Sequence, residues 1–519
     1  MQPEKKPTSK NNVVKVNILL ATITFCAGAI TMVIELAGNR LLAPLFGNTL
    51  YTWTGLIGII LAAMSAGYYF GGWLADKKPS FIILGNLLLA SSLFAFIAPL
   101  LYRVTEPLLI GTSIIWGPAL ASLIFFAMPA FFLGTVTPFA IRLASAASGD
   151  RHVGIAAGFI GMLSVLGSVT GTFATGFFLI PLLGIRAIFT LSGILLAILA
   201  LILYLFSSGK KKTKIIHVSV VALILASSYV AHAAGAIPRE PYILYQHTNF
   251  YHRITVIKQW FWDAGGARML HLDTTTEGGQ FENSMEPVLA YYRYWQLAQL
   301  RNTAPARILV LGGGSFYLPE LFTLQYPQSN VEVFEIDPEV VRVGKTFFRT
   351  DQYPTMNIQV GDARRQLAMS TNHYDVIFGD AYHGKRNIPA HLVTKEFFAS
   401  VNEHLTDDGI YIMNIISALQ GEKSRLLCSI VKTLSRVFAG VYVFSVEPGF
   451  PDQYQNVLIV ATKKSLDIET KKSKAQGTLR AILETYIAPH VYASHMDTAS
   501  IFTDDYNPVE YIIAQGLTS

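Results

Sequence analysis

Residues 307–315, RILVLGGGS, decide the fold of the C-terminal half of this chain. The five residues before the glycines are mostly apolar, as is typical of a buried parallel strand, and they run directly into three glycines. Glycine has no Cβ, so a ligand can approach the backbone closely there. A glycine turn alone is weak evidence, because many such turns only reverse the chain. The segments that follow decide whether this one binds a ligand.

Three further strand patterns follow, and each ends in an acid. The next pattern ends at Glu335, 21 residues after Gly314, which is about the spacing at which an acid binds ribose hydroxyls. The third ends in Gly-Asp-Ala at 361–363, where an acid can meet the exocyclic amine of adenine. The fourth ends at Asp380, where a transferred group would lie.

The order of these patterns predicts the architecture. Strand and helix patterns alternate through this half, which indicates a parallel sheet with helices on both faces. In such sheets, ligands bind beyond the carboxyl ends of the strands. A single acid at a strand end is as readily a helix cap as a ligand. Four strand ends of this kind, in order, indicate a nucleotide site.

The spacing does not by itself separate a nicotinamide dinucleotide from an S-adenosyl nucleotide. Asp380 favours the second, because a carboxylate beside the transferred group can orient an amine, take its proton and stabilise a cation. Residues 242–281 alternate between apolar and polar, which predicts a small antiparallel β-unit. We therefore expect a small β-unit and linker helix at 241–300, followed at 301–519 by a Rossmann-like α/β domain that binds an S-adenosyl nucleotide.

The residues before about 240 predict a different structure. The chain is 52% hydrophobic and only 14% charged, which is too apolar for a soluble protein, and the excess lies in long apolar runs. Seven runs are near the length that crosses a bilayer. They cover about 16–36, 52–75, 80–102, 116–140, 153–180, 185–206 and 215–236. We expect residues 1–240 to form a multi-pass α-helical membrane domain with about seven transmembrane helices.

Glycines recur at about four-residue spacing in the fifth run. They are Gly154, Gly158, Gly161, Gly167 and Gly171. Small residues at this spacing let helices pack closely in lipid. The plainer interpretation makes each of them apolar filler, and the sequence does not decide between the two.

Basic clusters indicate the orientation in the cell membrane. Four lysines precede the first run, and further clusters follow the second, fourth and sixth. The positive-inside rule then places the N-terminus in the cytoplasm. A seventh span would place the C-terminal domain outside, whereas the supply of an adenosyl co-substrate is intracellular. Both placements stay open.

The strand-end motifs resemble those of the spermidine synthase (polyamine aminopropyltransferase) family, and the whole chain resembles membrane-fused spermidine synthase-like proteins. The segments that carry the resemblance are Gly312-Gly313-Gly314, Glu335-Ile336-Asp337, Gly361-Asp362-Ala363, 374–380 (YDVIFGD), Ile388-Pro389-Ala390-His391-Leu392, 35–44 (ELAGNRLLAP) and 503–510 (TDDYNPVE).

The resemblance implies a transferase of polyamine biosynthesis. Such enzymes move an aminopropyl group from decarboxylated S-adenosylmethionine to an amine, here putrescine or a variant polyamine, and release methylthioadenosine. Asp380 would be the catalytic proton acceptor, Glu335 would hold the ribose, and Pro389 would line the nucleoside pocket. The full set of implied nucleoside-binding residues is His252, Gly312, Gly313, Gly314, Glu335, Asp362, Ala363 and Pro389.

The sequence departs from the family on the amine side. Ser315 stands where the glycine loop continues into aspartate, His383 replaces the second acid of an Asp-x-x-Asp motif, and His252 stands where glutamine is usual. Ser315, Tyr382 and His383 are therefore weak substrate-side candidates. A dication needs carboxylates to offset its lost hydration, so we expect poor turnover of putrescine. The acids that remain as replacements are Asp273, Glu277, Glu282 and Asp504.

Three functions compete. The first is an aminopropyltransferase-like enzyme, and the second is a methyltransferase using S-adenosylmethionine itself, because the nucleoside cradle is shared. The third is a non-enzymatic membrane transporter or sensor with a nucleoside- or polyamine-binding domain.

Cys26 and Cys428 have no metal-type spacing, and we expect no metal. The expected partners are the lipid bilayer and an amine or polyamine, with no nucleic acid, and a homodimer is one open oligomeric state. Loop histidines such as His391 are more often solvated than bound to a ligand.

We predict a cytoplasmic N-terminus, because four lysines precede the first apolar run and the later basic clusters alternate with it. A reporter fused to the N-terminus should be active only in the cytoplasm. A fusion that is active only outside the cell would refute this orientation.

Overall fold

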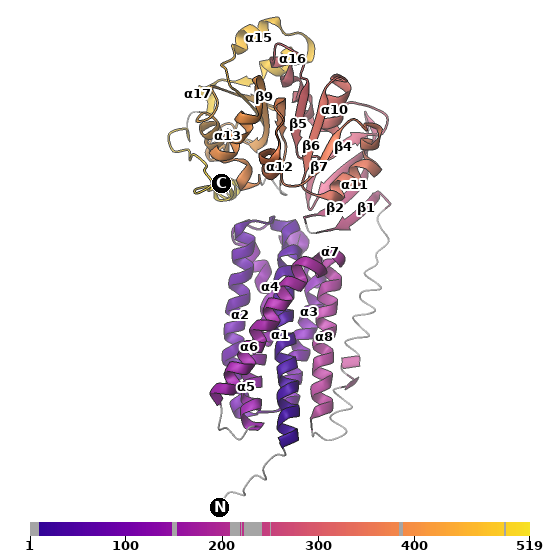
Figure 1. Cartoon of the computed structure of the whole chain (residues 1–519), viewed down its shortest axis with the longest axis vertical. Coiled ribbons are helices and arrows are strands. Elements are labelled where there is room, and N and C mark those ends of the chain that lie inside the picture. Colours follow the sequence, from indigo (N-terminus) through magenta and orange to yellow (C-terminus); the bar gives the residue numbers. More distant parts are fainter. Residues whose placement is uncertain are drawn as a thin grey trace, which may run out of the picture. The chain divides into compact units, whose positions relative to one another are not determined.

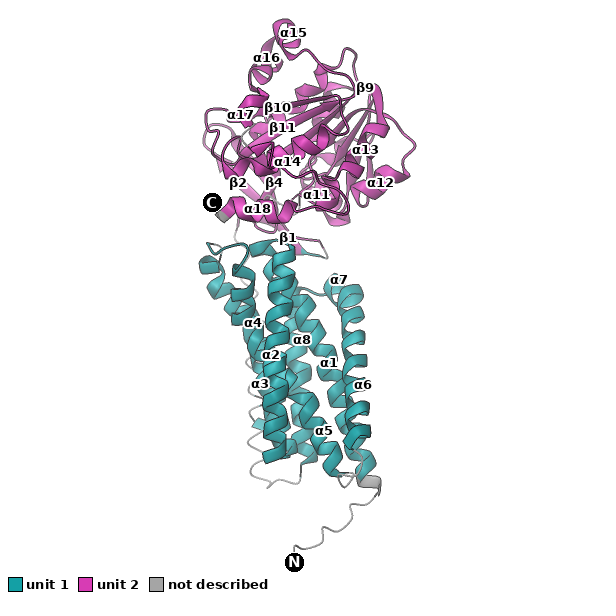
Figure 2. Ribbon diagram, turned by 90° about the vertical axis from the view of Figure 1, so that its left-hand side faces the viewer, with its two compact units in different colours: residues 1–238, 248–250 teal, residues 239–247, 251–519 magenta. Residues whose placement is uncertain are grey.

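The computed structural model describes residues 10–109, 111–147, 153–207, 218–219, 221–222, 241–249, 251–382, 388–492 and 495–518. The chain divides into two compact units, shown in different colours in Figure 2. The first comprises Met1–Pro238 with Thr248–Phe250, and the second comprises Arg239–His247 with Tyr251–Ser519.

The first unit is built from long apolar helices (Figure 1). They are α1 (Lys10–Phe46), α2 (Leu50–Lys77), α3 (Phe81–Leu109), α4 (Gly117–Gly134), α5 (Val136–Ala147), α6 (Val153–Ala174), the π-helical turn η1 (Thr175–Leu179), α7 (Ile180–Leu182) and α8 (Ile185–Phe206). Within the described residues, six helical stretches are long and apolar enough to cross a membrane. They coincide with the first six predicted runs, whereas most of the seventh, 215–236, lies outside the described residues.

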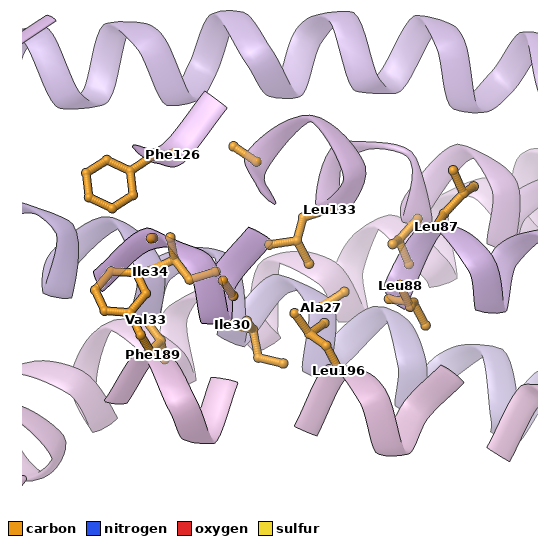
Figure 3. Close-up of a cluster of buried hydrophobic side chains, with 14 of the residues drawn as sticks. Ala27, Ile30, Val33, Ile34, Leu87, Leu88, Phe126, Leu133, Phe189 and Leu196 are labelled. Carbon is orange, nitrogen blue, oxygen red and sulfur yellow. The ribbon is translucent and has the colours of Figure 1, made fainter. Parts of the chain in front are cut away.

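Helix α1 forms the centre of this unit, because it packs against α2, α3, α4, α5, α6 and α8. Its buried residues recur every three or four positions, as Ala27, Ile30 and Ile34 do, so that they form a stripe along the helix. Figure 3 shows this stripe meeting side chains of α3, α4 and α8, among them Leu88 and Phe189. The apolar helices of this unit thus pack against one another through buried side chains.

The second unit begins with the predicted small β-unit. Its strands are β1 (Ile243–Thr248), β2 (Arg253–Phe261), β3 (Gly265–Leu272) and β4 (Thr275–Phe281), in that order across a four-stranded sheet. β2 and β3 pair antiparallel, as do β3 and β4. The 3₁₀ helix η2 (Ala290–Leu300) then leads into the main sheet.

The main sheet has eight strands in the order β12-β10-β11-β9-β8-β5-β6-β7. They are β5 (Arg307–Leu311), β6 (Asn330–Glu335), β7 (Asn357–Val360), β8 (Tyr374–Gly379), β9 (Leu405–Ser417), β10 (Gly440–Ser445), β11 (Gln455–Thr462) and β12 (Tyr486–Ile487). The helices around them are α10 (Tyr317–Gln325), α11 (Pro338–Phe347), η3 (Thr350–Gln352), α12 (Ala363–Met369), η4 (Ala390–Leu392), α13 (Lys395–His404), η5 (Glu422–Ser424), α14 (Arg425–Leu434), α15 (Ile468–Lys474), α16 (Gly477–Glu484), α17 (Pro489–Tyr492) and α18 (Val509–Thr518).

Strands β5 to β9 run parallel, and the other edge of the sheet is antiparallel. The predicted parallel sheet is therefore right for the half that carries the strand-end motifs and incomplete at β10, β11 and β12. The connection from β10 to β11 explains the difference. It spans only 446–454, which is too short for the crossover that a parallel pair needs.

Alternate residues of β5 fill two separate cores. Ile308 and Val310 pack in the core shared with α10 and α11, and Leu309 and Leu311 pack in the core shared with α12 and α13. Because both faces of the strand are buried, it reads as a continuous apolar run. The predicted α/β fold with helices on both faces is confirmed (Figure 1).

The glycines of α6 divide into two groups. A Cβ on Gly167 would lie 2.0 Å from the carbonyl oxygen of Phe25, and one on Gly171 would lie 2.2 Å from that of Ala29, both in α1. A Cβ on Gly154, Gly158 or Gly161 would meet nothing within 4 Å. Close packing of α6 against α1 thus requires glycine at Gly167 and Gly171. It does not require glycine at Gly154, Gly158 or Gly161.

This division gives a matched test of helix packing. Gly167→Ala and Gly171→Ala should each destabilise the helical unit by about 1–3 kcal/mol, because the added methyl group forces α1 and α6 apart. Gly158→Ala should change stability by less than about 1 kcal/mol, because it adds helix propensity in open space. Thermal unfolding of the detergent-purified chain would measure this, and equal effects at positions 158 and 171 would contradict the assignment.

Candidate active site

The register of the parallel strands brings the predicted motifs to one edge of the sheet. Leu311 at the end of β5 pairs with Phe334 of β6 on one side and with Gly379 of β8 on the other. Glu335 pairs with Val360 of β7. The residues that follow each strand therefore lie next to one another beyond the carboxyl ends of the strands.

A cavity of about 200 Å³ lies at this edge. Its lining includes most of the residues that the sequence singles out, namely His252, Gly312, Gly313, Gly314, Glu335, Asp362, Ala363, Asp380, Tyr382 and Pro389. Residues from the small β-unit and from η2 complete the described wall. No lysine or arginine is among the described residues that line it.

The glycine loop lets two strand ends approach closely. Gly312 has a φ of +97°, and a Cβ there would lie 2.4 Å from the backbone oxygen of Asp380. Glycine is required on both counts, since a side chain would be strained and would clash. The backbone N–H of Gly313 points to Glu335, to which it donates a hydrogen bond of 2.7 Å.

Glu335 is fixed by backbone donors. Its Oε2 accepts the bond from Gly313, and its Oε1 accepts one of 2.9 Å from the N–H of Asp337. Burial raises the pKa of Glu335, and these two N–H groups partly offset the rise. A carboxylate held in this way keeps lone pairs that can accept bonds from a diol.

Asp362 serves two roles in the described structure. Its Oδ1 caps α12 by accepting a hydrogen bond of 2.9 Å from the N–H of Arg365. Its Oδ2 forms an ion pair of 2.7 Å with Nε2 of His391. The hydrogen bond from His391 lowers the pKa of Asp362, although burial opposes the change. His391 therefore lines the cavity and contacts Asp362, while its side chain stays 45% exposed, as expected for a loop histidine.

Asp380 is half-buried and lies between two side-chain donors. Tyr291 donates its hydroxyl to Oδ2 at 2.8 Å, and Asn414 donates its amide to Oδ1 at 2.8 Å. Burial raises the pKa of Asp380 to about 6, although both donors favour the charged form. The carboxylate is thus oriented and desolvated, and its pKa is close enough to neutral pH for it to accept a proton.

The predicted substrate-side residues differ in placement. Ser315 is buried next to the hydroxyl of Tyr292, at 3.3 Å, and does not line the cavity. Tyr382 lines the cavity and donates its hydroxyl to the backbone oxygen of Asn414 at 3.1 Å. His383 lies outside the described residues.

His252 is buried beside Asp273, with 3.1 Å between Nδ1 and Oδ2. Burial lowers the pKa of His252, but the hydrogen bond and charge of Asp273 more than offset this, so the net shift is upward. The imidazole is therefore held by an acid of the small β-unit. It forms the wall of the cavity on the side of that unit.

Of the four acids that could replace the missing carboxylates, Glu277 alone lines the cavity. Asp273 is bound to His252, Glu282 pairs with Lys258 at 2.9 Å, and Asp504 pairs with Arg364 at 2.5 Å. These three carboxylates already have basic side chains as partners.

Sequence reasoning missed the two residues that hold Asp380. Tyr291 lies in the 3₁₀ helix η2, and Asn414 lies in β9. The signal for Asn414 is an amide within the apolar run 410–416, because a buried amide needs a hydrogen-bond partner. Tyr291 carries no comparable signal, since tyrosines are frequent in this segment.

Comparison with known proteins finds the following similarities. The chain is 24% identical over 484 residues to polyamine aminopropyltransferase 2 of Aquifex aeolicus (strain VF5), which covers 88% of this chain and 90% of that protein. It is 27% identical over 233 residues to the polyamine aminopropyltransferase of Vibrio vulnificus (strain CMCP6), which covers 43% of this chain and 75% of that protein. The solved structure of a probable spermidine synthase from Corynebacterium glutamicum ATCC 13032 has 21% identity and a TM-score of 0.42, covering 48% of this chain and 93% of that one.

A family model gives the remaining evidence. Residues 295–471 match the spermine/spermidine synthase domain, and this range contains the glycine loop and the strand-end acids Glu335, Asp362 and Asp380. The resemblance noted in the sequence is confirmed: the part of this chain that contains these acids is similar to the spermine/spermidine synthase domain.

Proposed function

We propose that the domain transfers an aminopropyl group from decarboxylated S-adenosylmethionine to an amine acceptor. The amine nitrogen attacks the aminopropyl carbon next to the sulfonium, a C–N bond forms, and the C–S bond breaks with its electron pair passing to sulfur. Methylthioadenosine leaves, and Asp380 takes the proton that the nitrogen loses. The observation that carries the proposal is the half-buried, doubly hydrogen-bonded Asp380 in the same cavity as the glycine loop.

The position of Asp380 suits a base for an aliphatic amine. Such amines are protonated at pH 7 and must lose a proton to act as nucleophiles. With a pKa of about 6, Asp380 is mostly ionised at pH 7 yet is a stronger base than an exposed aspartate. Tyr291 and Asn414 keep it oriented while the charge on the nitrogen changes.

The nucleoside half of the cavity supports an adenosyl donor. Glu335 would accept bonds from the ribose hydroxyls, and the backbone around Asp362 and Ala363 would meet the adenine. Pro389 and the glycine loop would form the apolar and backbone walls. All of these residues line the one cavity.

The charge of the cavity favours the decarboxylated donor over S-adenosylmethionine. The latter carries a carboxylate, which would lie near Asp380 and Glu277 with no lysine or arginine among the described lining residues to offset it. The methyltransferase alternative is thus disfavoured by charge. A transporter or sensor would not need a half-buried base beside the nucleoside.

We propose further that the helical unit resides in the cell membrane with the bilayer as its partner. The six long apolar helices support this placement. The acceptor would be a soluble amine or polyamine that reaches the cavity of the α/β unit.

Glu335→Ala should weaken the binding of methylthioadenosine by about 1–3 kcal/mol, because the ribose loses its acceptor. Titration calorimetry on the full chain in detergent would measure this. Glu332→Gln is the matched control, because Glu332 lies on the same strand but bonds Asn357 and Tyr374 and does not line the cavity. Unchanged affinity in Glu335→Ala would sink the assignment.

Asp380→Asn should keep the fold and the affinity for methylthioadenosine but cut the single-turnover rate by about 10²-fold or more. The fold is kept because asparagine can still accept from Asn414 and donate to Tyr291. In the wild type, the base is ionised above pH 6, so the rate should fall about tenfold per unit as the pH drops below 6. If Asp380→Asn turned over nearly as fast as the wild type, Asp380 would be structural and the proposal would fail.

A further inference from the structure

Glu277 is the one acid of the cavity that the described structure leaves without a stabilising donor. It lies in β4, and its side chain lines the cavity. Its Oε1 is buried, and no described group forms a hydrogen bond with it. A buried polar atom without a partner is costly and requires an explanation. A ligand that donates to Glu277 would provide one.

Strand β4 packs directly on the glycine loop. A Cβ on Gly278 would lie 2.4 Å from both the hydroxyl oxygen of Ser315 and that of Tyr292, and one on Gly314 would lie 3.2 Å from the backbone oxygen of Glu277. Position 315 is where the resemblance leads one to expect an acid. The contact places β4 beside position 315, and Glu277 of this strand lines the cavity that Ser315 does not reach.

The groups that face Glu277 are mostly acidic. Burial raises its pKa to about 8, and the charges of Asp380, Asp273 and Glu335 add to the rise, while His252 opposes it. In the unliganded cavity at pH 7, Glu277 is therefore mostly protonated. A bound cation would favour the ionised form, so cation binding and loss of the proton from Glu277 are coupled.

The wall around Glu277 suits an alkylammonium ion. Tyr291, Tyr292, Tyr317 and Tyr382 line the same cavity. The ring centroids of Tyr291 and Tyr292 are 4.6 Å apart, and those of Tyr292 and Tyr317 are 4.7 Å apart. Aromatic rings attract cations and also provide apolar surface for a methylene chain. A carboxylate set among tyrosines thus matches both parts of an aliphatic amine.

We propose that Glu277 binds the aliphatic ammonium group of an amine substrate beside Asp380 and so supplies the carboxylate absent from positions 315 and 383. This proposal rests on the proposed aminopropyl transfer. Glu277 holds the cationic end, Asp380 takes the proton of the reacting nitrogen, and the tyrosines cover the carbon chain. The ammonium group belongs either to the aminopropyl arm of the donor or to the acceptor, which share this chemistry.

The test compares Glu277→Gln with the wild type by titration calorimetry on the full chain in detergent. The probes are methylthioadenosine, decarboxylated S-adenosylmethionine, and putrescine added to the methylthioadenosine complex. Each titration is run at pH 7 in two buffers of different ionisation enthalpy, which gives the number of protons released. Glu282→Gln is the matched control, because Glu282 follows β4 but pairs with Lys258 outside the cavity.

We expect Glu277→Gln to bind methylthioadenosine within about twofold of the wild type and to lose at least about tenfold in affinity for an amine probe. The probe that loses affinity identifies the donor or the acceptor as the source of the ammonium group. The wild type and Glu282→Gln should release up to about one proton on binding that probe, and Glu277→Gln should release none.

Two results would overturn the proposal. One is Glu277→Gln binding both amine probes as tightly as the wild type. The other is a wild type that binds decarboxylated S-adenosylmethionine no more tightly than methylthioadenosine and does not bind putrescine in the methylthioadenosine complex, a measurement that does not depend on whether the variant folds. If the wild type binds an amine and releases a proton but forms no aminopropylated product, the transfer reaction fails while the role of Glu277 stands.

Discussion

The register of four parallel strands, β7, β6, β5 and β8, is the constraint on which the candidate site depends. Leu311 pairs with both neighbours of β5, so Gly312, Glu335 and Asp380 emerge side by side. A slip of one residue would turn every side chain of a strand to the opposite face. The apolar residues of the strands prevent such a slip because they fill cores on both faces. The packing of the interior thus fixes the position of Glu335 and Asp380 at the carboxyl edge of the sheet.

Four acidic residues line one small cavity, and three of them show how differently the fold surrounds like groups. Glu335 receives two backbone N–H groups, Asp380 receives two side-chain donors, and Glu277 has an oxygen with no donor among the described groups. Different surroundings separate the protonation behaviour of like groups, which is how neighbouring acids take different roles. Uncompensated burial of an acid is unfavourable for folding, and the proposed binding of a cation by Glu277 would offset it.

The sequence predicts motifs that are contiguous in the chain. It does not predict contacts between side chains that come from distant segments. A strand that runs into glycines, with an acid at the end of each following strand, fixes the nucleoside side of the cavity, because each motif is contiguous in the chain. Tyr291 and Asn414 meet Asp380 from 89 and 34 residues away, and no local pattern pairs them. Ser315 faces Tyr292 rather than the cavity, since neighbours in sequence can point in different directions. The antiparallel pairing of β10 with β11 follows from the short connection between them. The alternation of strand and helix patterns does not predict that pairing.

The contact between Asp362 and His391 bears on how the proposed adenosyl donor would be recognised. A free carboxylate would gain a hydrogen bond when the base arrives. Asp362 instead already has one oxygen committed to the cap of α12 and the other to the imidazole. Each oxygen keeps further lone-pair capacity, so a bond from the exocyclic amine would be added to these two bonds and not exchanged for one of them. In the proposed complex, the helix cap and the imidazole would fix the direction of the remaining lone pairs, and selectivity for adenine would come from that direction together with the shape of the backbone around Ala363.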